Sequence, residues 1–379
     1  MSATNNETLD PIVQQWAEQV RTAHDEKKPL QLQGSGSKSF YGHPTEGEPI
    51  SLTAYQGVID YEPSELVVTV KGGTSLAELE ALLDSKKQFL PFEPPHFGPD
   101  ATVAGCIASG LAGPRRAQVG GVRDFVLGVK VIDGQGRALT FGGQVMKNVA
   151  GYDVSRLLTG SMGTLAIMTE LSIKVLPKPV KEITLKLELD QAQALQKLNQ
   201  WGGQPIPISA SAWFDEQLYL RLSGAPSALS TAQEIIQGSL LEAEPAQQLW
   251  QQIREQTHTW FKQSADKGST DGADASAASQ GGLWRLSVPS TAAPILPDLP
   301  QLIEWGGALR WCYSDLPAAE IRSQVEAVGG TATLFRSARN ELGVFHALDP
   351  VVLGIQQRLK QKFDPAGIFN PGRIYPGEL

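Results

Sequence analysis

The sequence predicts an α+β protein of two domains, and three observations support this class. The chain has 379 residues, which at about 150 residues per domain corresponds to two or three domains. Hydrophobic residues make up 41% of it and charged residues 19%, the balance of a globular chain with enough apolar side chains for a sizeable core. Helix and strand patterns are mixed along the chain, and most of its 38 glycines lie before residue 180 and near the C-terminus.

The first domain begins with a helix and continues with strands separated by glycine-rich loops. Residues 10–24 fit a helix because apolar side chains recur there at helical spacing. Ser75 followed by Glu78 predicts a capping box that opens a helix over residues 76–83. Residues 91–121 are crowded with proline and glycine and predict a long loop. Strands are expected over residues 29–33, 65–70, 126–132, 138–141 and 165–176.

A change of composition at residues 177–179 marks the start of a second, α+β domain, which is richer in tryptophan and poorer in glycine. A strand over residues 183–189 opens it, and residues 264–282 predict a surface loop because they are small and polar and show no period. A helix near the C-terminus should end at Asp364-Pro365. We therefore expect a first domain over residues 1–179, a second over 180–350, and a C-terminal segment over 351–379.

Composition excludes several classes of protein. The net charge of −8 disfavours nucleic acid and anionic lipid as main partners. Cys106 and Cys312 are the only cysteines and stand far apart, which excludes a disulfide framework, a cysteine-rich zinc site and an iron–sulfur cluster within this chain. The five histidines lack zinc-site spacing, so no metal is expected. Since no signal-peptide pattern and no membrane-spanning apolar run occur, the sequence predicts a cytoplasmic protein.

The sequence GSGSK at residues 34–38 follows an expected strand. It is neither a Rossmann fingerprint nor a Walker A loop, because Ser39 and Ser37 stand where those motifs need glycine. Its backbone N–H groups, hydroxyls and lysine suit an anion such as a pyrophosphate, although this loop alone also fits an ordinary turn. Further loops rich in small residues follow at residues 101–110, 115–128 and 160–165. Four such loops in one region predict a shared dinucleotide ligand.

The order of these motifs carries a family resemblance. The motifs are GSGS at 34–37, ATVAGCIASG at 101–110, GGVRDFVLG at 120–128, KNVAGYD at 147–153, GSMGTL at 160–165 and FDPAGIFNPGR at 363–373. Together they resemble the vanillyl-alcohol oxidase / p-cresol methylhydroxylase (PCMH) family of flavoproteins, and essentially the whole chain resembles one subgroup, the FAD-binding subunits of bacterial glycolate oxidases. The resemblance implies a two-subdomain PCMH-type FAD-binding domain, an α+β cap domain, and a C-terminal tail that returns to the FAD domain.

The resemblance also implies which residues bind FAD. They are Gly34, Ser35, Gly36, Ser37, Thr102, Gly105, Ser109, Gly110, Gly120, Arg123, Asp124, Gly163, Ile167 and Asn370. The positions that carry a covalent flavin link in some members hold Ser37, Lys38 and Ser39 here, and Cys106 lies outside the family's cysteine-linkage context. We therefore expect FAD to be bound non-covalently.

Oxidation of a 2-hydroxy acid requires a cation for the carboxylate, a base for the hydroxyl proton and the flavin as hydride acceptor. The candidate cations are Arg115, Lys147, Arg310, Arg336 and Arg373. We favour Arg336 as the carboxylate clamp, with His96 as a candidate base and Lys147 as a further catalytic candidate, although each also fits a structural role. The histidine-rich metal motif of related catalytic dehydrogenases does not occur here, and Met162 replaces the acid of their G-S-E-G motif.

The resemblance therefore implies the FAD subunit of a complex that oxidises glycolate, a small 2-hydroxy acid, to glyoxylate. The implied partners are a sister FAD subunit and an iron–sulfur subunit that accept the electrons, and any attachment to the inner membrane is peripheral and through the complex. The missing metal motif favours the sister subunit as the place of substrate oxidation. Two alternatives stay open: a stand-alone FAD-dependent dehydrogenase for D-lactate or another 2-hydroxy acid, and a non-catalytic scaffold subunit.

Overall fold

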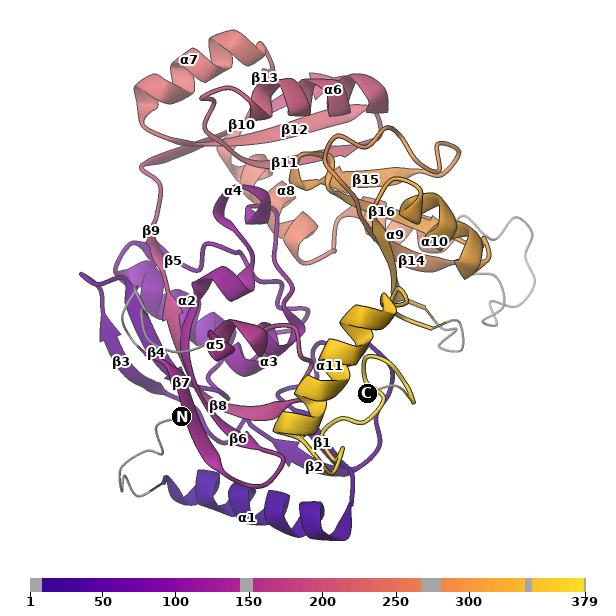
Figure 1. Cartoon of the computed structure of the whole chain (residues 1–379). Helices are drawn as coiled ribbons and strands as arrows, with labels where there is room; N and C mark the ends of the chain where they lie inside the picture. The colour runs from indigo at the N-terminus through magenta and orange to yellow at the C-terminus, as the bar shows by residue number, and fades with distance from the viewer. Residues whose placement is uncertain (1–8, 144–152, 267–280, 338–342, 378–379) are drawn as a thin grey trace. The chain divides into compact units, whose positions relative to one another are not determined.

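The computed structural model describes residues 9–143, 153–266, 281–337 and 343–377 of the chain. The chain divides into two compact units, drawn in Figure 1. Unit 1 comprises Met1–Ala112, Gly121–Lys178 and Ala347–Leu379, and unit 2 comprises Gly113–Gly120 and Pro179–His346. The chain therefore passes between the units after residues 112, 120, 178 and 346, and its C-terminal segment belongs to unit 1.

Unit 1 is built on a five-stranded antiparallel sheet in the order β3-β4-β8-β6-β7. Its strands are β3 (Val58–Glu62), β4 (Val67–Lys71), β6 (Val126–Asp133), β7 (Ala138–Gly142) and β8 (Ala166–Lys174). The inner strands β4, β8 and β6 are buried along most of their length, as expected for runs of valine, leucine and isoleucine that are covered on both faces. They form the core of the unit.

The described part of unit 1 contains the three helices that the sequence predicts, together with three short ones that it does not. The predicted helices are α1 (Pro11–Glu26), α2 (Leu76–Ser85) and α11 (Pro350–Phe363), and the short ones are α3 (Val103–Ser109), η1 (Val122–Phe125) and α5 (Val154–Leu157). The Ser75 side chain accepts a hydrogen bond from the Glu78 amide at 3.4 Å and starts α2, as predicted. The apolar face of α1 is buried, which its 3.6-residue spacing requires.

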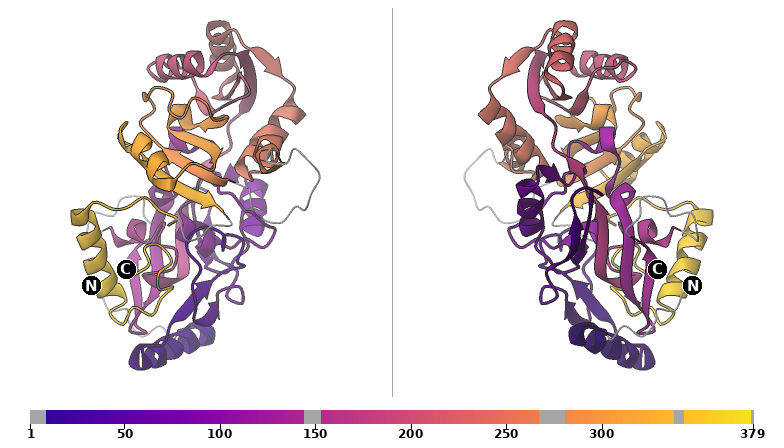
Figure 2. Two further views of the ribbon diagram at one scale, coloured as in Figure 1. Left: turned by 90° about the vertical axis from the view of Figure 1, so that its right-hand side faces the viewer. Right: turned by 90° about the vertical axis from the view of Figure 1, so that its left-hand side faces the viewer.

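Unit 1 also contains two small two-stranded sheets, and one strand of the first leads into the glycine-rich loop. Strand β1 (Leu30–Gln33) pairs in parallel with β2 (Glu48–Ser51), and β5 (Gln88–Phe89) pairs with β9 (Leu176–Pro177). The other edge of β1 is covered by the C-terminal tail, where the Leu30 amide donates to Ile368 O at 2.7 Å and the Asn370 amide donates to Leu30 O at 3.0 Å. Figure 2 shows α11 alongside the rest of unit 1 in both views. The tail is therefore an integral part of this unit.

Unit 2 contains an eight-stranded antiparallel sheet in the order β13-β10-β12-β11-β15-β16-β14-β17. Its strands are β10 (Lys181–Glu188), β11 (Ile208–Phe214), β12 (Gln217–Gly224), β13 (Ser239–Leu241), β14 (Gly282–Ser287), β15 (Gln301–Glu304), β16 (Leu309–Ser314) and β17 (Thr331–Arg336). Its helices are α6 (Gln191–Gly202), α7 (Pro226–Ile236), α8 (Ala243–Arg254), α9 (Thr259–Asp266), η2 (Trp305–Gly307) and α10 (Ala318–Glu326). Two apolar clusters, one with α6 and α7 and one with α10, form its core.

A short segment from the first half of the sequence, Gly113–Gly120 with helix α4 (Arg116–Val119), also belongs to unit 2. Trp305 anchors it, because the indole Nε1 donates to Gly113 O at 3.0 Å and the Arg116 guanidinium lies 4.5 Å from the centre of the indole ring. Arg115 is buried and pairs with Glu182 on β10. These contacts explain why eight residues flanked by unit 1 pack within unit 2.

The architecture confirms the predicted α+β class. The prediction of a continuous loop over residues 91–121 is wrong, because Val103–Ser109 forms helix α3. The Thr102 hydroxyl caps this helix by accepting from the Gly105 amide at 3.2 Å, and Gly110 ends it with φ +65°. The surface loop predicted over residues 264–282 falls mostly outside the described residues. Among the helices that the structure describes, none is long and apolar enough to cross a membrane.

Candidate functional site

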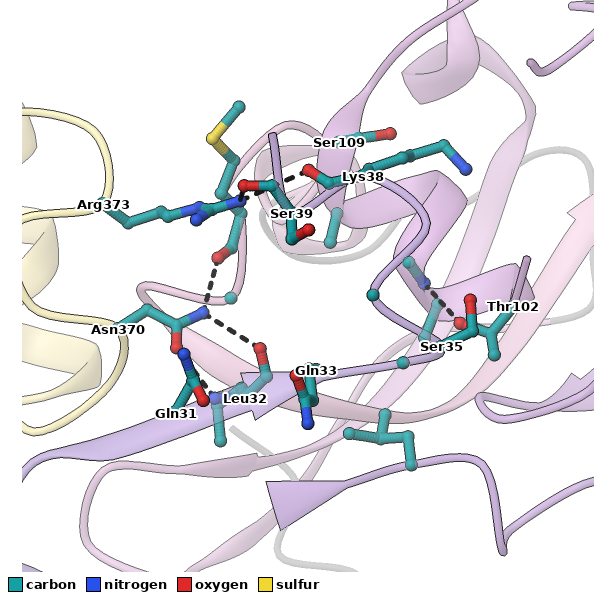
Figure 3. Close-up of a pocket in the computed structure, with 18 of the residues that line it drawn as sticks. Gln31, Leu32, Gln33, Ser35, Lys38, Ser39, Thr102, Ser109, Asn370 and Arg373 are labelled. Carbon is teal, nitrogen blue, oxygen red and sulfur yellow. Dashed lines mark hydrogen bonds between the residues drawn. The ribbon is translucent and has the colours of Figure 1, made fainter. Parts of the chain in front are cut away.

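A pocket in unit 1 gathers three of the four loops that the sequence singled out. Figure 3 shows it between the end of β1, helix α3, the turn before β8 and the C-terminal tail. The residues that line it are Gln31, Leu32, Gln33, Gly34, Ser35, Gly36, Ser37, Lys38, Ser39, Tyr41, Thr45, Leu52, Thr102, Ala104, Gly105, Ala108, Ser109, Met162, Gly163, Ala166, Ile167, Met168, Asn370 and Arg373. Segments far apart in the sequence therefore share one site.

The glycine-rich loop after β1 offers hydrogen-bond donors to this pocket. Within the described parts of the chain, the backbone N–H groups of Ser35, Gly36 and Ser37 have no acceptor, and the buried hydroxyl of Ser35 has no partner. Gly36 has φ +79°, and no described atom lies within 4 Å of the position that a Cβ would take. Adjacent N–H groups in such a turn form a concave anion site, so the loop fits a pyrophosphate group.

Helix α3 lies close against this loop because the facing residues are small. A Cβ on Gly34 would collide with the Thr102 side chain, and one on Gly105 would lie 3.0 Å from the Thr102 hydroxyl oxygen. Ala104, Ala108 and the glycines therefore leave backbone surface against which a ligand can lie.

Asn370 of the tail joins the two opposite walls of the pocket, as Figure 3 shows. Its Oδ1 accepts from the Leu32 amide at 2.7 Å, and its Nδ2 donates to Leu32 O at 3.2 Å and to Met162 O at 2.8 Å. A Cβ on Gly163 would lie 2.7 Å from Asn370 Nδ2, so this turn requires glycine. The amide of Asn370 thus fixes the end of β1 relative to the turn that precedes β8.

Two cations, Lys38 and Arg373, line the pocket. Lys38 Nζ donates to His96 O at 3.0 Å. The Arg373 guanidinium donates to His43 O at 2.8 Å and to Ser39 O at 3.0 Å, and burial lowers its pKa. Among the residues that the structure describes, no carboxylate pairs with Arg373. The pocket therefore carries positive charge, which complements an anionic ligand.

The structure brings most of the predicted FAD residues to this pocket, with four exceptions. Gly110 ends helix α3, where a Cβ would lie 3.1 Å from Gly160 Cα. Gly120 belongs to the segment that packs within unit 2. Arg123 and Asp124 are exposed, and the Asp124 carboxylate accepts from the Gly121 amide at 2.8 Å, which caps its own turn. None of the four lines the pocket.

The catalytic candidates lie elsewhere in the described chain or outside it. His96 Nε2 lies 3.1 Å from Glu80 Oε2 in unit 1, and neither residue lines the pocket. Arg336 ends β17 in unit 2, where burial lowers its pKa and its guanidinium lies 5.7 Å from the Phe335 ring centre. Lys147 falls outside the described residues.

Arg310, another candidate cation, is fully buried in unit 2. It donates to Ala293 O at 2.8 Å, to Gly307 O at 3.2 Å and to Ala292 O at 2.5 Å, and burial lowers its pKa to about 10. These contacts hold a loop, so the structure gives this residue a role in folding and not in binding a substrate.

Both cysteines are free and buried. Burial raises the pKa of Cys106 to about 12 and that of Cys312 to about 12, so both remain neutral thiols near neutral pH. Cys106 does not line the pocket. The geometry therefore offers no thiolate to a flavin in this pocket.

Several lining residues could not be assigned from motifs. Leu32, Met162 and Ala166 flank the glycine positions. Arg373 was one of the candidate cations, but the sequence did not assign it to the FAD pocket. The only signal in the sequence for the first three is position: Leu32 and Ala166 lie next to a loop and Met162 lies within the GSMG motif, and nothing in their side-chain chemistry predicts a ligand.

Comparisons with known proteins agree with this geometry. A family model described as an FAD binding domain matches residues 13–142, which include the glycine-rich loop and α3. The chain is 33% identical over 172 residues to a D-lactate dehydrogenase of Anaerostipes hadrus, covering 44% of this chain and 35% of that protein. The solved structure of an alkyldihydroxyacetonephosphate synthase shares the fold, with a TM-score of 0.62 and 13% identity, over 94% of this chain and 74% of that chain.

Two relatives are glycolate oxidase subunits. Subunit GlcD of Bacillus subtilis (strain 168) is 34% identical over 163 residues, which cover 42% of this chain and 34% of that protein. Subunit GlcE of Escherichia coli (strain K12) is 45% identical over 360 residues, which cover 94% of this chain and 96% of that protein. The resemblance drawn from the motifs and the FAD cofactor are both confirmed, and the chain belongs to the family of the glycolate oxidase subunit GlcE.

Proposed function

We propose that this chain is the FAD-binding subunit of a complex that oxidises glycolate to glyoxylate. The observation that carries the proposal is the similarity to GlcE along nearly the whole of both chains. The matches to D-lactate dehydrogenases cover between 41% and 55% of this chain and at most 36% of those proteins, so a stand-alone dehydrogenase for D-lactate or another 2-hydroxy acid is the weaker alternative.

The pocket supports a defined division of roles. Oxidation of glycolate to glyoxylate removes two electrons and two protons, and FAD supplies the acceptor for a hydride. The N–H groups and the orphaned hydroxyl at residues 35–37 would bind the pyrophosphate, with Lys38 and Arg373 balancing its charge. We propose as FAD-binding residues Gly34, Ser35, Gly36, Ser37, Thr102, Gly105, Ser109, Gly163, Ile167 and Asn370, and we leave out the four predicted residues that do not line the pocket.

The flavin in this proposal is held without a covalent bond. Ser37, Lys38 and Ser39 occupy the loop, and the buried Cys106 thiol lies outside the pocket. Acid precipitation of the protein would release all of the FAD into the supernatant, whereas yellow colour retained in the pellet would contradict non-covalent binding.

We further propose that electrons leave through partner subunits, namely a sister FAD subunit and an iron–sulfur subunit. The full sequence has two cysteines, too few for the four thiolates of a typical cluster. Any attachment to the inner membrane would be peripheral, through the complex. The roles of Arg336 as a carboxylate clamp and His96 as a base also stay proposals, with Glu80 orienting the His96 ring.

Anaerobic reduction of the flavin tests the proposed function. The tagged chain would be purified with its partners, its absorbance near 450 nm recorded, and glycolate or D-lactate added. Bleaching by glycolate in the complex supports the proposal. Bleaching of the isolated chain by D-lactate and not by glycolate would favour the stand-alone dehydrogenase. A complex that oxidises glycolate while the chain takes up no FAD would support the scaffold alternative.

A further inference from the structure

A buried ion pair in the C-terminal segment, Lys360 with Asp364, lies behind one wall of the FAD pocket. Lys360 is 8% exposed and Asp364 is 1% exposed, and their Nζ and Oδ2 atoms are 2.8 Å apart. Neither residue lines the pocket. Burial of charged groups costs desolvation free energy even when they are paired, so this pair calls for an explanation.

The ammonium of Lys360 ties together two backbone segments. Its Nζ donates to Thr164 O at 2.7 Å and to Phe369 O at 3.1 Å, in addition to Asp364. The three N–H groups of the ammonium thus each have one acceptor, and its hydrogen-bonding capacity is fully used. Thr164 directly follows Gly163 of the pocket, and Phe369 directly precedes Asn370 of the pocket.

The carboxylate of Asp364 binds two backbone N–H groups of the same tail. Its Oδ2 accepts from the Phe369 amide at 2.8 Å, and its Oδ1 accepts from the Ile368 amide at 3.1 Å. Both backbone groups of Phe369 are therefore bound by the ion pair. Since Asn370 comes next, the pair determines where the Asn370 side chain stands.

We infer that Lys360 and Asp364 are positioning residues for FAD binding, acting through Asn370 and the turn at Thr164. The ion pair fixes the tail, Asn370 then joins Leu32 to Met162, and the two walls of the pocket take the spacing that the dinucleotide needs. Outer hydrogen bonds of this kind set the precision of a binding site. The inference rests on the assignment of FAD to this pocket and concerns residues that do not touch the ligand.

The test measures the affinity of the full-length, FAD-free chain for FAD by quenching of flavin fluorescence. In the double variant Lys360→Met/Asp364→Asn, no charge is left buried without a partner, but the link to Thr164 O is lost. We expect its Kd for FAD to rise at least tenfold while its circular dichroism stays native. Lys130→Met is the matched control, because Lys130 forms a 3.2 Å ion pair with Glu170 in the same unit and does not line the pocket. Its Kd should stay within twofold of the wild-type value.

A double-mutant comparison separates positioning from a general loss of stability. If the ion pair and Asn370 hold the same two walls, the Kd of the combined variant should rise by clearly less than the product of the rises in Lys360→Met/Asp364→Asn and in Asn370→Ala. If the rise in Kd of the combined variant equals the product of the rises in the two separate variants, the inference is overturned. A folded ion-pair variant that binds FAD within twofold of wild type would overturn it as well.

Hydrogen exchange of the unaltered protein gives a test that does not depend on how the variants fold. We expect FAD to slow amide exchange at Ile368, Phe369 and Asn370 at least tenfold, with no change in the β7 peptide at residues 138–142. Unchanged exchange in the tail of a chain that has bound FAD would refute the coupling. Since no substrate enters either assay, a failure of glycolate to bleach the flavin would refute the proposed function alone.

Discussion

Replacement of Gly36 by alanine should weaken FAD binding and lower the stability of the FAD-free chain by a predictable amount. The residue has φ +79°, and the space around its missing Cβ contains no described atom within 4 Å. An L-residue in this left-handed region costs about 1–2 kcal/mol. The added methyl group also occupies space that the structure leaves open beside the N–H groups of the loop. We expect the Kd for FAD to rise at least tenfold, about 1.4 kcal/mol of binding free energy.

Gly329 provides a control for the backbone strain. It has φ +77° in unit 2, and likewise no described atom lies within 4 Å of its ideal Cβ. Gly329→Ala should therefore lower the melting temperature of the FAD-free chain about as much as Gly36→Ala, yet bind FAD normally. Thermal melting and flavin-fluorescence titration measure the two effects separately. Equal FAD affinities for Gly36→Ala and wild type would refute the placement of the ligand against this loop.

Three further predictions follow from single side chains. Ser35→Ala removes a buried hydroxyl without a described partner, so FAD affinity should fall about threefold to tenfold, for a hydrogen bond worth about 0.5–1.5 kcal/mol. The FAD-free variant should be no less stable in urea than the wild type. Unaltered affinity would show that the hydroxyl does not reach the ligand. Arg310→Met leaves three carbonyls of unit 2 without their donor, so the free energy of unfolding should fall by about 3 kcal/mol or more while FAD affinity is retained. Urea unfolding followed by tryptophan fluorescence measures this loss. An unchanged unfolding midpoint would contradict the structural role of Arg310. Burial, reinforced by Arg373, lowers the pKa of His43 below its ordinary value of 6.5. The unfolded chain therefore binds the proton more readily, and stability falls as the pH drops below 6.5. His43→Gln should flatten the decline of melting temperature from about pH 7 to about pH 5, and an equally steep decline would exclude His43 as its source.

The sequence predicted those parts of the fold that depend on local patterns. The helix at residues 10–24 and the N-cap at Ser75 follow from side chains within one or two turns, and both occur in the structure. Strand β3 was not predicted, because Val58–Glu62 is mostly exposed and does not show a buried apolar pattern. Helix α3 was interpreted as a loop because its small residues carry little periodic signal, although Thr102 and Gly110 mark its two ends.

The site was predictable where glycine is required and unpredictable where distant segments meet. Gly34, Gly36 and Gly163 stand at a close approach or a positive φ, and such positions leave a mark in the sequence. The contacts of Asn370 with Leu32 and Met162 join residues separated by 338 and 208 positions, and no local pattern encodes them. The exposure of Arg123 and Asp124 is likewise a tertiary property that their motif does not contain.

The eight-residue segment Gly113–Gly120 limits how the two units can be exchanged between relatives. A graft of residues 179–346 alone would leave Trp305 facing the segment of another protein, without its own Gly113 carbonyl and Arg116 guanidinium. A functional chimera must therefore carry two separate stretches of one parent, and its recombination points lie next to residues 112, 120, 178 and 346. Insertions and deletions in this short stretch are constrained in the same way, because it has to reach its anchor and return within eight residues.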